Sequence, residues 1–180
     1  MLEITIPGRE MAVETPDGIE FLTVKETKLQ LEHSLISLSK WESKWKKPFL
    51  SEEPRTRDEM IDYIRCMTIT QHVDPQIYDY IPFELYQKIE DYIGTEQTAT
   101  KIFDRRPTRG KKEIITSEVI YYWMIYHNIP SEYQKWHLSR LLTLIRVCSI
   151  KGSSQMMDQN AIYKENTRLN EMRRAAKGKR

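Results

Sequence analysis

Cysteine is scarce in this 180-residue sequence, which contains only Cys66 and Cys148. A disulfide framework needs more cysteines in a secretory context, so the sequence argues against one. Both cysteines lie within apolar helical patterns, and we expect buried free thiols that act as small apolar side chains. Long apolar runs are also missing, since none reaches the roughly 18 residues that a membrane-spanning helix needs. The first residues do not resemble a signal peptide. We therefore expect the protein to remain in the cell that makes it.

The sequence also lacks a recognisable catalytic or cofactor motif. It has no glycine-rich phosphate loop and no G-x-S-x-G nucleophile elbow. The four histidines are scattered, and neither cysteine lies near another ligand at zinc-finger spacing. His137 and Arg140 have the H-x-x-R spacing of tyrosine recombinases, with Tyr163 downstream, but no partner motif lies between Arg140 and Tyr163. We therefore expect no enzymatic activity, no metal and no cofactor.

Charge is distributed unevenly along the chain. The net charge is +2, but residues 151–180 contain eight lysines and arginines and three acidic residues, a net charge of +5. Residues 1–150 then carry a net charge of −3. A basic tail on a mildly acidic body suits a protein that docks on something negative through its terminus. A lysine-rich tail that serves only solubility has the same composition, and both interpretations stay open.

The first 32 residues predict strands. Residues 2–6, 20–24 and 28–31 alternate apolar and polar side chains, and Pro7-Gly8 and Pro16-Asp17-Gly18 interrupt the alternation. These strands predict a small antiparallel sheet. Because two or three strands are marginally stable in water, we expect the sheet to pack on the helices or on another subunit.

Helical periodicity dominates the remainder. Helices are expected from Ser34 to Trp45, after a capping box at Thr56, from Pro82 to Ile93, from Ser117 to His127, and after a second capping box at Ser131. Residues 151–154 are expected to end the last of these helices. The predicted fold class is α+β, a small N-terminal antiparallel β-sheet followed by a predominantly α-helical bundle and a basic C-terminal tail. The boundaries are 1–32 for the β segment, 33–150 for the helical body and 151–180 for the tail, which we expect to be mobile or ordered by a partner.

Residues 113–148, EIITSEVIYYWMIYHNIPSEYQKWHLSRLLTLIRVC, form an aromatic-rich helical pair around an Asn-Ile-Pro turn. The consecutive aromatics Tyr121, Tyr122 and Trp123 cannot all face one core on a helix, so at least one must point outward. Exposed Tyr and Trp beside Arg favour protein interfaces, while large aromatics also dominate cores. Core packing and a partner surface are therefore both open.

Nucleic-acid binding is the main alternative from residue chemistry. Residues 105–112 hold five basic residues in eight, and with the basic tail they offer contacts to phosphates. The body is acidic, the pI is 8.4, and the aromatics are not interleaved with the basic clusters. Nucleic acid is therefore not the partner we expect, and a small nucleic-acid-binding protein is the third function considered.

Four blocks in fixed order resemble a family of small proteins from tailed bacteriophages of the siphophage type, the tail assembly chaperone-like proteins. They are LEHSLISLSKWESKWKKPFLS at residues 31–51, DYIRCMTIT at 62–70, the segment 113–148, and NTRLNEMRR at 166–174. The portion EVIYYWMI…NIP…WHL.RLLTLIRVC is the specific one. The resemblance touches most of the chain.

The resemblance implies a non-enzymatic chaperone that binds the tape measure or tail tube protein during tail morphogenesis in the host cytoplasm, self-associates, and has no membrane partner. The alternative is a structural virion subunit of the tail or baseplate. The residues expected at a partner surface are Tyr121, Tyr122, Tyr126, Trp136, Arg173, Arg174, Lys177, Lys179 and Arg180.

Overall fold

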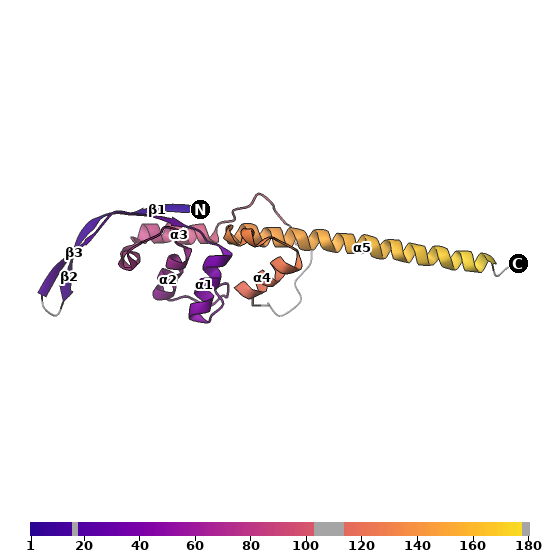
Figure 1. Ribbon diagram of the computed structural model, residues 1–180, viewed down its shortest axis with the longest axis horizontal. Coiled ribbons are helices and arrows are strands. Elements are labelled where there is room, and N and C mark those ends of the chain that lie inside the picture. Colours follow the sequence, from indigo (N-terminus) through magenta and orange to yellow (C-terminus); the bar gives the residue numbers. More distant parts are fainter. Residues whose placement is uncertain (16–17, 103–113, 178–180) are drawn as a thin grey trace.

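The computed structural model describes residues 1–15, 18–102 and 114–177. It has an α+β fold, as predicted, with four strands at the N-terminus and, within the described residues, five α-helices and two short 3-10 helices. The molecule is elongated (Figure 1): a β-ribbon projects from one end of a helical body, and a long helix projects from the other. The basic loop at residues 105–112 and the turn at Pro16-Asp17 lie outside the described residues.

The N-terminal strands form two separate two-stranded sheets. β1 (Leu2–Ile6) pairs antiparallel with β4 (Thr27–Leu31), and β2 (Arg9–Thr15) pairs antiparallel with β3 (Gly18–Val24). The alternating pattern correctly predicted β1 and the cores of β3 and β4, but β2 was not predicted. One face of the β1–β4 sheet is buried, as the sheet prediction required, and packs on the helices. Its buried residues are Ile4, Ile6, Leu29 and Leu31.

Gly8 lies where the chain passes from the β1–β4 sheet into the ribbon. A Cβ atom at this position would lie 3.1 Å from the backbone nitrogen of Glu26 and 3.3 Å from the carbonyl oxygen of Val24. The two strands therefore approach here more closely than a larger residue allows. Arg9 fixes the base of the ribbon by donating a hydrogen bond to the carbonyl oxygen of Tyr80, at 3.2 Å.

Three helices and a 3-10 turn form the first part of the body. They are α1 (Leu35–Trp45), α2 (Arg57–Met67), η1 (Pro75–Tyr80) and α3 (Phe83–Gly94). The predicted capping box of α2 is confirmed, because the Thr56 hydroxyl accepts from the Glu59 amide and the Glu59 carboxylate accepts from the Thr56 amide. α1 has the same arrangement between Ser34 and Ser37. Leu35, Leu38 and Trp41 of α1 are buried, as are Met60, Ile64 and Met67 of α2, while Trp45, on the same face of α1, is only half-buried.

An aromatic cluster occupies the centre of the core. The rings of Phe49 and Tyr63 stack with centroids 3.8 Å apart, and Trp41 meets Phe49 edge-on at 5.1 Å. The Trp41 indole nitrogen donates to the carbonyl oxygen of Glu59 at 2.8 Å, so this ring buries no unpaired donor. These contacts join α1, α2 and the loop between them.

The second part of the body contains α4 (Ser117–Tyr126), η2 (Ser131–Lys135) and α5 (Leu138–Lys177). The predicted capping box at Ser131 is wrong, because Ser131 lies inside a 3-10 turn that follows Pro130, and α5 begins seven residues later. The predicted helix end at residues 151–154 is also wrong. Glycine and serine lower helix propensity by about 1 kcal/mol or less each, which does not end a helix when proline is absent. α5 therefore runs through them into the basic tail.

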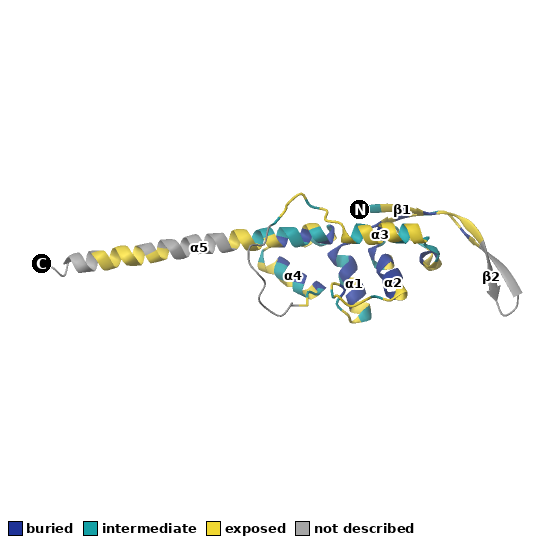
Figure 2. Cartoon of the chain, turned by 180° about the vertical axis from the view of Figure 1, so that it is seen from behind, coloured by how far each residue is buried: buried dark blue, intermediate teal, exposed yellow. Residues whose placement is uncertain are grey.

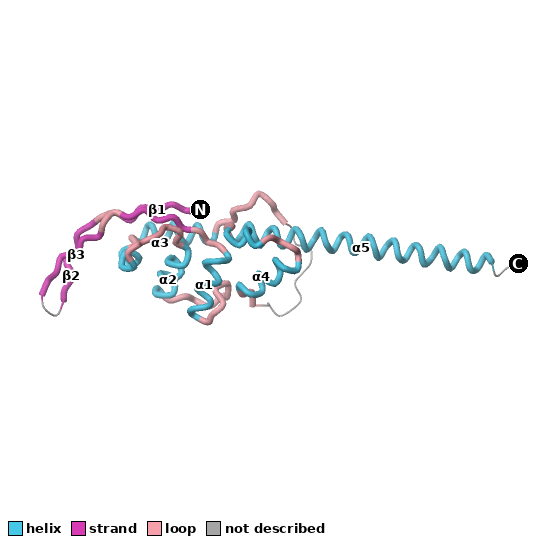
Figure 3. Tube along the Cα trace, viewed as in Figure 1, coloured by secondary structure: helices cyan, strands magenta, loops and turns pink. Residues whose placement is uncertain are grey.

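Figure 2 shows that burial is concentrated in the body, while the described residues of α5 beyond it are exposed. The tube in Figure 3 follows α5 as one continuous helix from the body to its far end. Leu138, Leu141 and Ile145 of α5 are buried, while Leu142 is only half-buried. Cys66 and Cys148 are free but only half-buried, which corrects the expectation of fully buried thiols. The inner part of α5 thus belongs to the core, and the outer part, which we call the α5 extension (residues 151–177), leaves it.

Candidate functional site

The outward face of α4 carries an apolar and aromatic patch. Tyr122, Ile125 and Tyr126 are 61%, 76% and 63% exposed, and they occupy positions i, i+3 and i+4 of the helix. The rings of Tyr122 and Tyr126 stack with centroids 6.3 Å apart, so the two side chains present one continuous surface. We call these three residues the α4 patch. The prediction that at least one of the consecutive aromatics points outward is confirmed at Tyr122.

The opposite face of α4 holds the helix rigidly in the body. Ile120 and Met124 are buried in the core, and the start of α4 is anchored by Glu42 of α1. One carboxylate oxygen of Glu42 accepts from the Ser117 amide at 2.7 Å, and the other accepts from the Phe49 amide at 2.9 Å. Thr116, at the N-cap of α4, makes no side-chain cap, so Glu42 supplies an acceptor and negative charge at this helix start. The apolar periodicity of α1 did not predict that Glu42 would bind the start of α4.

Replacing Glu42 by Gln tests this anchor. The amide group of Gln can accept only one of the two N–H bonds and turns a donor toward the other, so a buried N–H loses its partner. We expect the free energy of unfolding to fall by about 1–3 kcal/mol. Urea denaturation followed by circular dichroism measures it, with the exposed Glu26→Gln as the control, expected within about 0.5 kcal/mol of the parent. Equal stability of Glu42→Gln and the parent would remove Glu42 as the anchor of α4.

Tyr121 and Trp136, two other predicted partner residues, are only half exposed. Tyr121 turns toward η2, where its hydroxyl donates to the side-chain oxygen of Gln134 at 2.9 Å. Trp136 lies between the edge-on ring of Tyr133, at 4.3 Å, and the guanidinium of Arg140, at 4.5 Å from its centroid. Both aromatics therefore pack the α4–η2–α5 corner, and they are less available to a partner than the α4 patch.

The predicted tail residues are far from the α4 patch along α5. Arg173, Arg174 and Lys177 have helical backbone, but their side chains lie outside the described part of the structure. Lys179 and Arg180 lie outside the described residues altogether. The structure thus does not join the aromatic and the basic candidates into one site.

Two buried histidines join α5 to the rest of the body. His33 and His137 are each 4% exposed, and their rings lie 5.2 Å apart. The Tyr63 hydroxyl lies 2.5 Å from Nδ1 of His33, and the backbone amide of Leu138 donates to the carbonyl oxygen of His33 at 2.7 Å. No sequence pattern predicts this pair, because 103 intervening residues separate its members.

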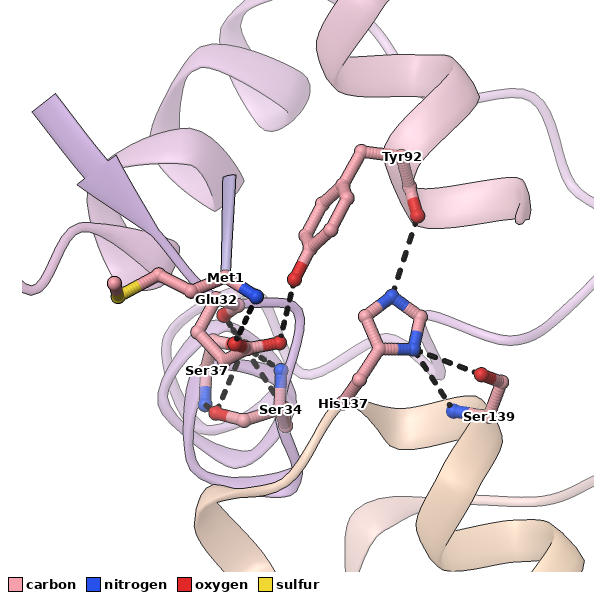
Figure 4. Close-up of polar contacts among 7 residues, drawn as sticks. All are labelled: Met1, Glu32, Ser34, Ser37, Tyr92, His137 and Ser139. Carbon is pink, nitrogen blue, oxygen red and sulfur yellow. Dashed lines mark hydrogen bonds and ion pairs between the residues drawn. The ribbon is translucent and has the colours of Figure 1, made fainter. Parts of the chain in front are cut away.

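Figure 4 shows how His137 begins α5. Its Nδ1 accepts from the Ser139 amide at 3.3 Å, so the ring acts as a cap, and its Nε2 lies 3.2 Å from the carbonyl oxygen of Tyr92. Nδ1 as acceptor and Nε2 as donor define a neutral ring. The Tyr92 hydroxyl in turn donates to the Glu32 carboxylate at 2.7 Å, and the Met1 amine pairs with that carboxylate at 2.9 Å. α3, the segment between β4 and α1, and α5 meet in this cluster of Glu32, His33, Tyr92 and His137, which we call the joint.

The joint strongly favours uncharged histidines. Burial lowers the pKa of His33 to about 3, and the neighbouring His137 and Arg55 act in the same direction. Burial also lowers the pKa of His137. Near pH 7 both rings are neutral, and the joint holds together through hydrogen bonds and packing.

The H-x-x-R residues do not converge on a site within one chain. His137 is buried, Arg140 stacks on Trp136, and Tyr163 lies about 35 Å beyond Arg140 along the same helix, at a rise of about 1.5 Å per residue. Among the described residues no group of three or more His, Cys, Asp and Glu side chains is placed to hold a metal ion. Within the same residues, no helix is both long and apolar enough to cross a membrane.

Compared with models of known protein families, with curated protein sequences and with solved structures, the chain matches none. The features that bear on function are therefore the α4 patch, the shape of the molecule and the resemblance of its sequence blocks.

Proposed function

We propose that the protein is a non-enzymatic phage tail assembly chaperone, which binds the tape measure or tail tube protein through the α4 patch and self-associates along its partner. The observation that carries the proposal is the exposed face of α4, where Tyr122, Ile125 and Tyr126 leave a stacked aromatic and aliphatic surface in water. Such a surface on a rigid helix is the usual chemistry of a protein-binding site.

The geometry suits a partner with apolar helices. Positions i, i+3 and i+4 of one helix form a ridge that packs against the apolar stripe of another helix. The tyrosine hydroxyls allow the same surface to remain in water when the partner is absent. Together these properties favour a chaperone that covers apolar helices until assembly proceeds.

A structural virion subunit is the second candidate function. The observation that favours it is the elongated shape with projections at both ends (Figure 1), which suits permanent contacts to several neighbours. The α4 patch would then be a fixed interface.

Co-expression with the tape measure protein of the same phage tests the chaperone proposal. We expect the soluble fraction of the tape measure protein to rise several-fold when this chain is present, and the two to co-purify. A tape measure protein that is equally soluble without this chain, or that stays insoluble with it, contradicts the proposal. The tail tube protein is tested in the same way as the second possible client.

A further inference from the structure

The joint attaches the first turn of α5 to the segment before α1. The carbonyl oxygen of His33 accepts from the Leu138 amide at 2.7 Å, and Ser34 pairs with His137 as an isolated antiparallel bridge. The rings of His33 and His137 lie edge-on to each other, with centroids 5.2 Å apart. Backbone and side-chain contacts of these two histidines therefore hold the start of α5 in place.

Beyond the joint, α5 has a short apolar contact with the body. Among the side chains of α5 that the structure describes, only Leu138, Leu141 and Ile145 are buried, although the helix runs to Lys177. Segments with few buried apolar contacts open before the whole molecule unfolds. We therefore expect α5 to leave the body at a lower free-energy cost than α1 or α2, which pack around the aromatic cluster.

The groups around His33 do not stabilise a positive charge on its ring. Its titratable or charged neighbours are Tyr63 of α2, Arg55 in the loop before α2, and His137 of α5. None of the three is a carboxylate. The ring is also buried, so water cannot solvate a charge on it.

The surroundings of His137 are nearly as unfavourable to charge. Its titratable or charged neighbours are Tyr92 of α3, the Glu32 carboxylate, the Met1 amine and Arg140 on α5 itself. Glu32 is the one carboxylate among them, and Figure 4 shows it already bound to the Tyr92 hydroxyl and the Met1 amine. Protonation of Nδ1 would also remove the acceptor for the Ser139 amide. A closed joint therefore disfavours a charge on either ring.

We propose that the joint is an acid-sensitive latch, in which proton uptake by His33 and His137 releases α5 from the body while the core around Trp41, Phe49 and Tyr63 stays folded. Two positive rings 5.2 Å apart in a buried site repel each other, so the closed latch cannot hold both charges. Once α5 has left, water solvates both rings. Opening therefore takes up two protons, which makes it depend steeply on pH.

The expected size of the effect follows from His33. Its pKa is about 3 in the closed latch and near 6.5 in water, so the open form binds the proton more readily. The contribution of neutral His33 to closure is fully present above pH 6.5 and is lost as the pH falls toward 3. From His33 alone, the opening equilibrium shifts about 25-fold toward release between pH 7 and pH 5. Burial also lowers the pKa of His137, which adds to the shift.

The latch is independent of the client that the α4 patch binds. The start of α4 is held from α1, where the Glu42 carboxylate accepts from the Ser117 amide at 2.7 Å, and this anchor does not involve the joint. The test of the latch uses the purified protein without a client. Failure of the latch would leave the client proposal intact, and failure of client binding would leave the latch intact.

Hydrogen–deuterium exchange of the full chain, read by mass spectrometry, distinguishes release of α5 from global unfolding. A released helix is marginally stable in water, so its amides exchange. The peptides compared cover residues 142–150 of α5 and residues 57–67 of α2, with rates corrected for the intrinsic pH dependence of amide exchange. We expect the protection of the α5 peptide to fall by at least about 25-fold between pH 7 and pH 5. The α2 peptide should stay more protected than the α5 peptide at every pH.

Variants that cannot take up the protons identify the groups responsible. His137→Asn keeps an acceptor for the Ser139 amide, because Asn is a favourable N-cap, and it does not titrate. In the double variant His33→Gln, His137→Asn, we expect the protection of the α5 peptide to agree at pH 7 and pH 5 within about twofold. His72→Asn, at an exposed histidine, is the matched control and should keep the pH dependence of the parent.

Three results would overturn the latch. The first is equal protection of the α5 and α2 peptides at each pH, which means that α5 leaves only when the whole molecule unfolds. The second is protection of the α5 peptide that does not change between pH 7 and pH 5. The third is a double variant with the pH dependence of the parent. If circular dichroism shows that the double variant does not fold, the two peptides of the parent still decide between release and global unfolding.

Discussion

A protein carrying Tyr122→Ala and Tyr126→Ala is expected to bind the proposed client at least about 30-fold more weakly than the parent, since the loss of an aromatic anchor at an interface centre costs about 2 kcal/mol or more and the two stacked rings are counted as one anchor. The two rings stack on each other at the surface and make no hydrogen bond to the core. Their loss therefore removes binding surface and leaves the fold intact. Under the proposed function the client is a tape measure protein, and titration calorimetry or a pull-down at graded concentrations measures the affinity.

Phe83→Ala provides the matched control for the loss of an exposed aromatic. Phe83 is 72% exposed at the start of α3, outside the α4 patch. We expect this variant to bind the client as the parent does, and all variants to unfold within a few degrees of the parent. If the double tyrosine variant binds normally, or if Phe83→Ala weakens binding equally, the α4 patch is not the client surface.

Acidification is expected to destabilise the protein through its buried histidines. An unfolded histidine has a pKa near 6.5, whereas that of His33 is held at about 3, so the unfolded chain binds a proton more readily than the folded one. The contribution of His33 is fully present above pH 6.5 and is lost as the pH falls toward 3. Between pH 7.5 and pH 5 the free energy of unfolding should fall by about 2 kcal/mol from His33 alone. His137, whose pKa is also lowered, changes stability in the same direction.

The variant His33→Gln separates this effect from other titrations. It removes the titrating ring, so its unfolding free energy should depend on pH less steeply by about 2 kcal/mol over the same interval. His72→Asn, at an exposed histidine with φ of 57°, should keep the full dependence of the parent. The carboxylate of Glu59, whose pKa is lowered by Lys47, loses its contribution only below pH 4.5, outside this window. An unchanged slope in His33→Gln would contradict the assignment.

Local signals in the sequence predicted most of the helices. The capping box at Thr56 and the apolar spacing of α1 and α2 involve residues three or four apart, and these interactions persist in almost any tertiary context. The class α+β followed from them. The alternation of apolar and polar residues predicted β1 and β4 equally well, because one face of that sheet is buried on the helices.

The joint and the anchor of α4 were not predictable in this way. His33 contacts His137, and Glu42 bonds Ser117, although long stretches of sequence separate the members of each pair. Periodicity describes only residues that are close together in the sequence, so it cannot predict such pairs. The start of α5 was misplaced because Ser131 and Gln134 fit a capping box locally. In the structure Tyr133 packs on Trp136 in the turn after Pro130, and His137 provides the cap. The helix end at residues 151–154 was misplaced because glycine and serine weaken a helix without ending it.

The candidate site was predicted in part. The crowding of aromatics on residues 117–126 pointed to the helix that carries the α4 patch, but it did not separate Tyr122 and Tyr126, which face water, from Tyr121, which bonds Gln134. Ile125 was overlooked because it is not aromatic, although it is the most exposed of the three residues in the patch.

Quantitative mass spectrometry of purified virions and of the infected-cell lysate from which they come tests the central claim most directly. The chaperone account predicts abundant protein in the lysate and none in the virions, because the α4 patch releases its client once the tail is complete. A fixed copy number in every virion would contradict the account and would make the protein a structural component of the tail.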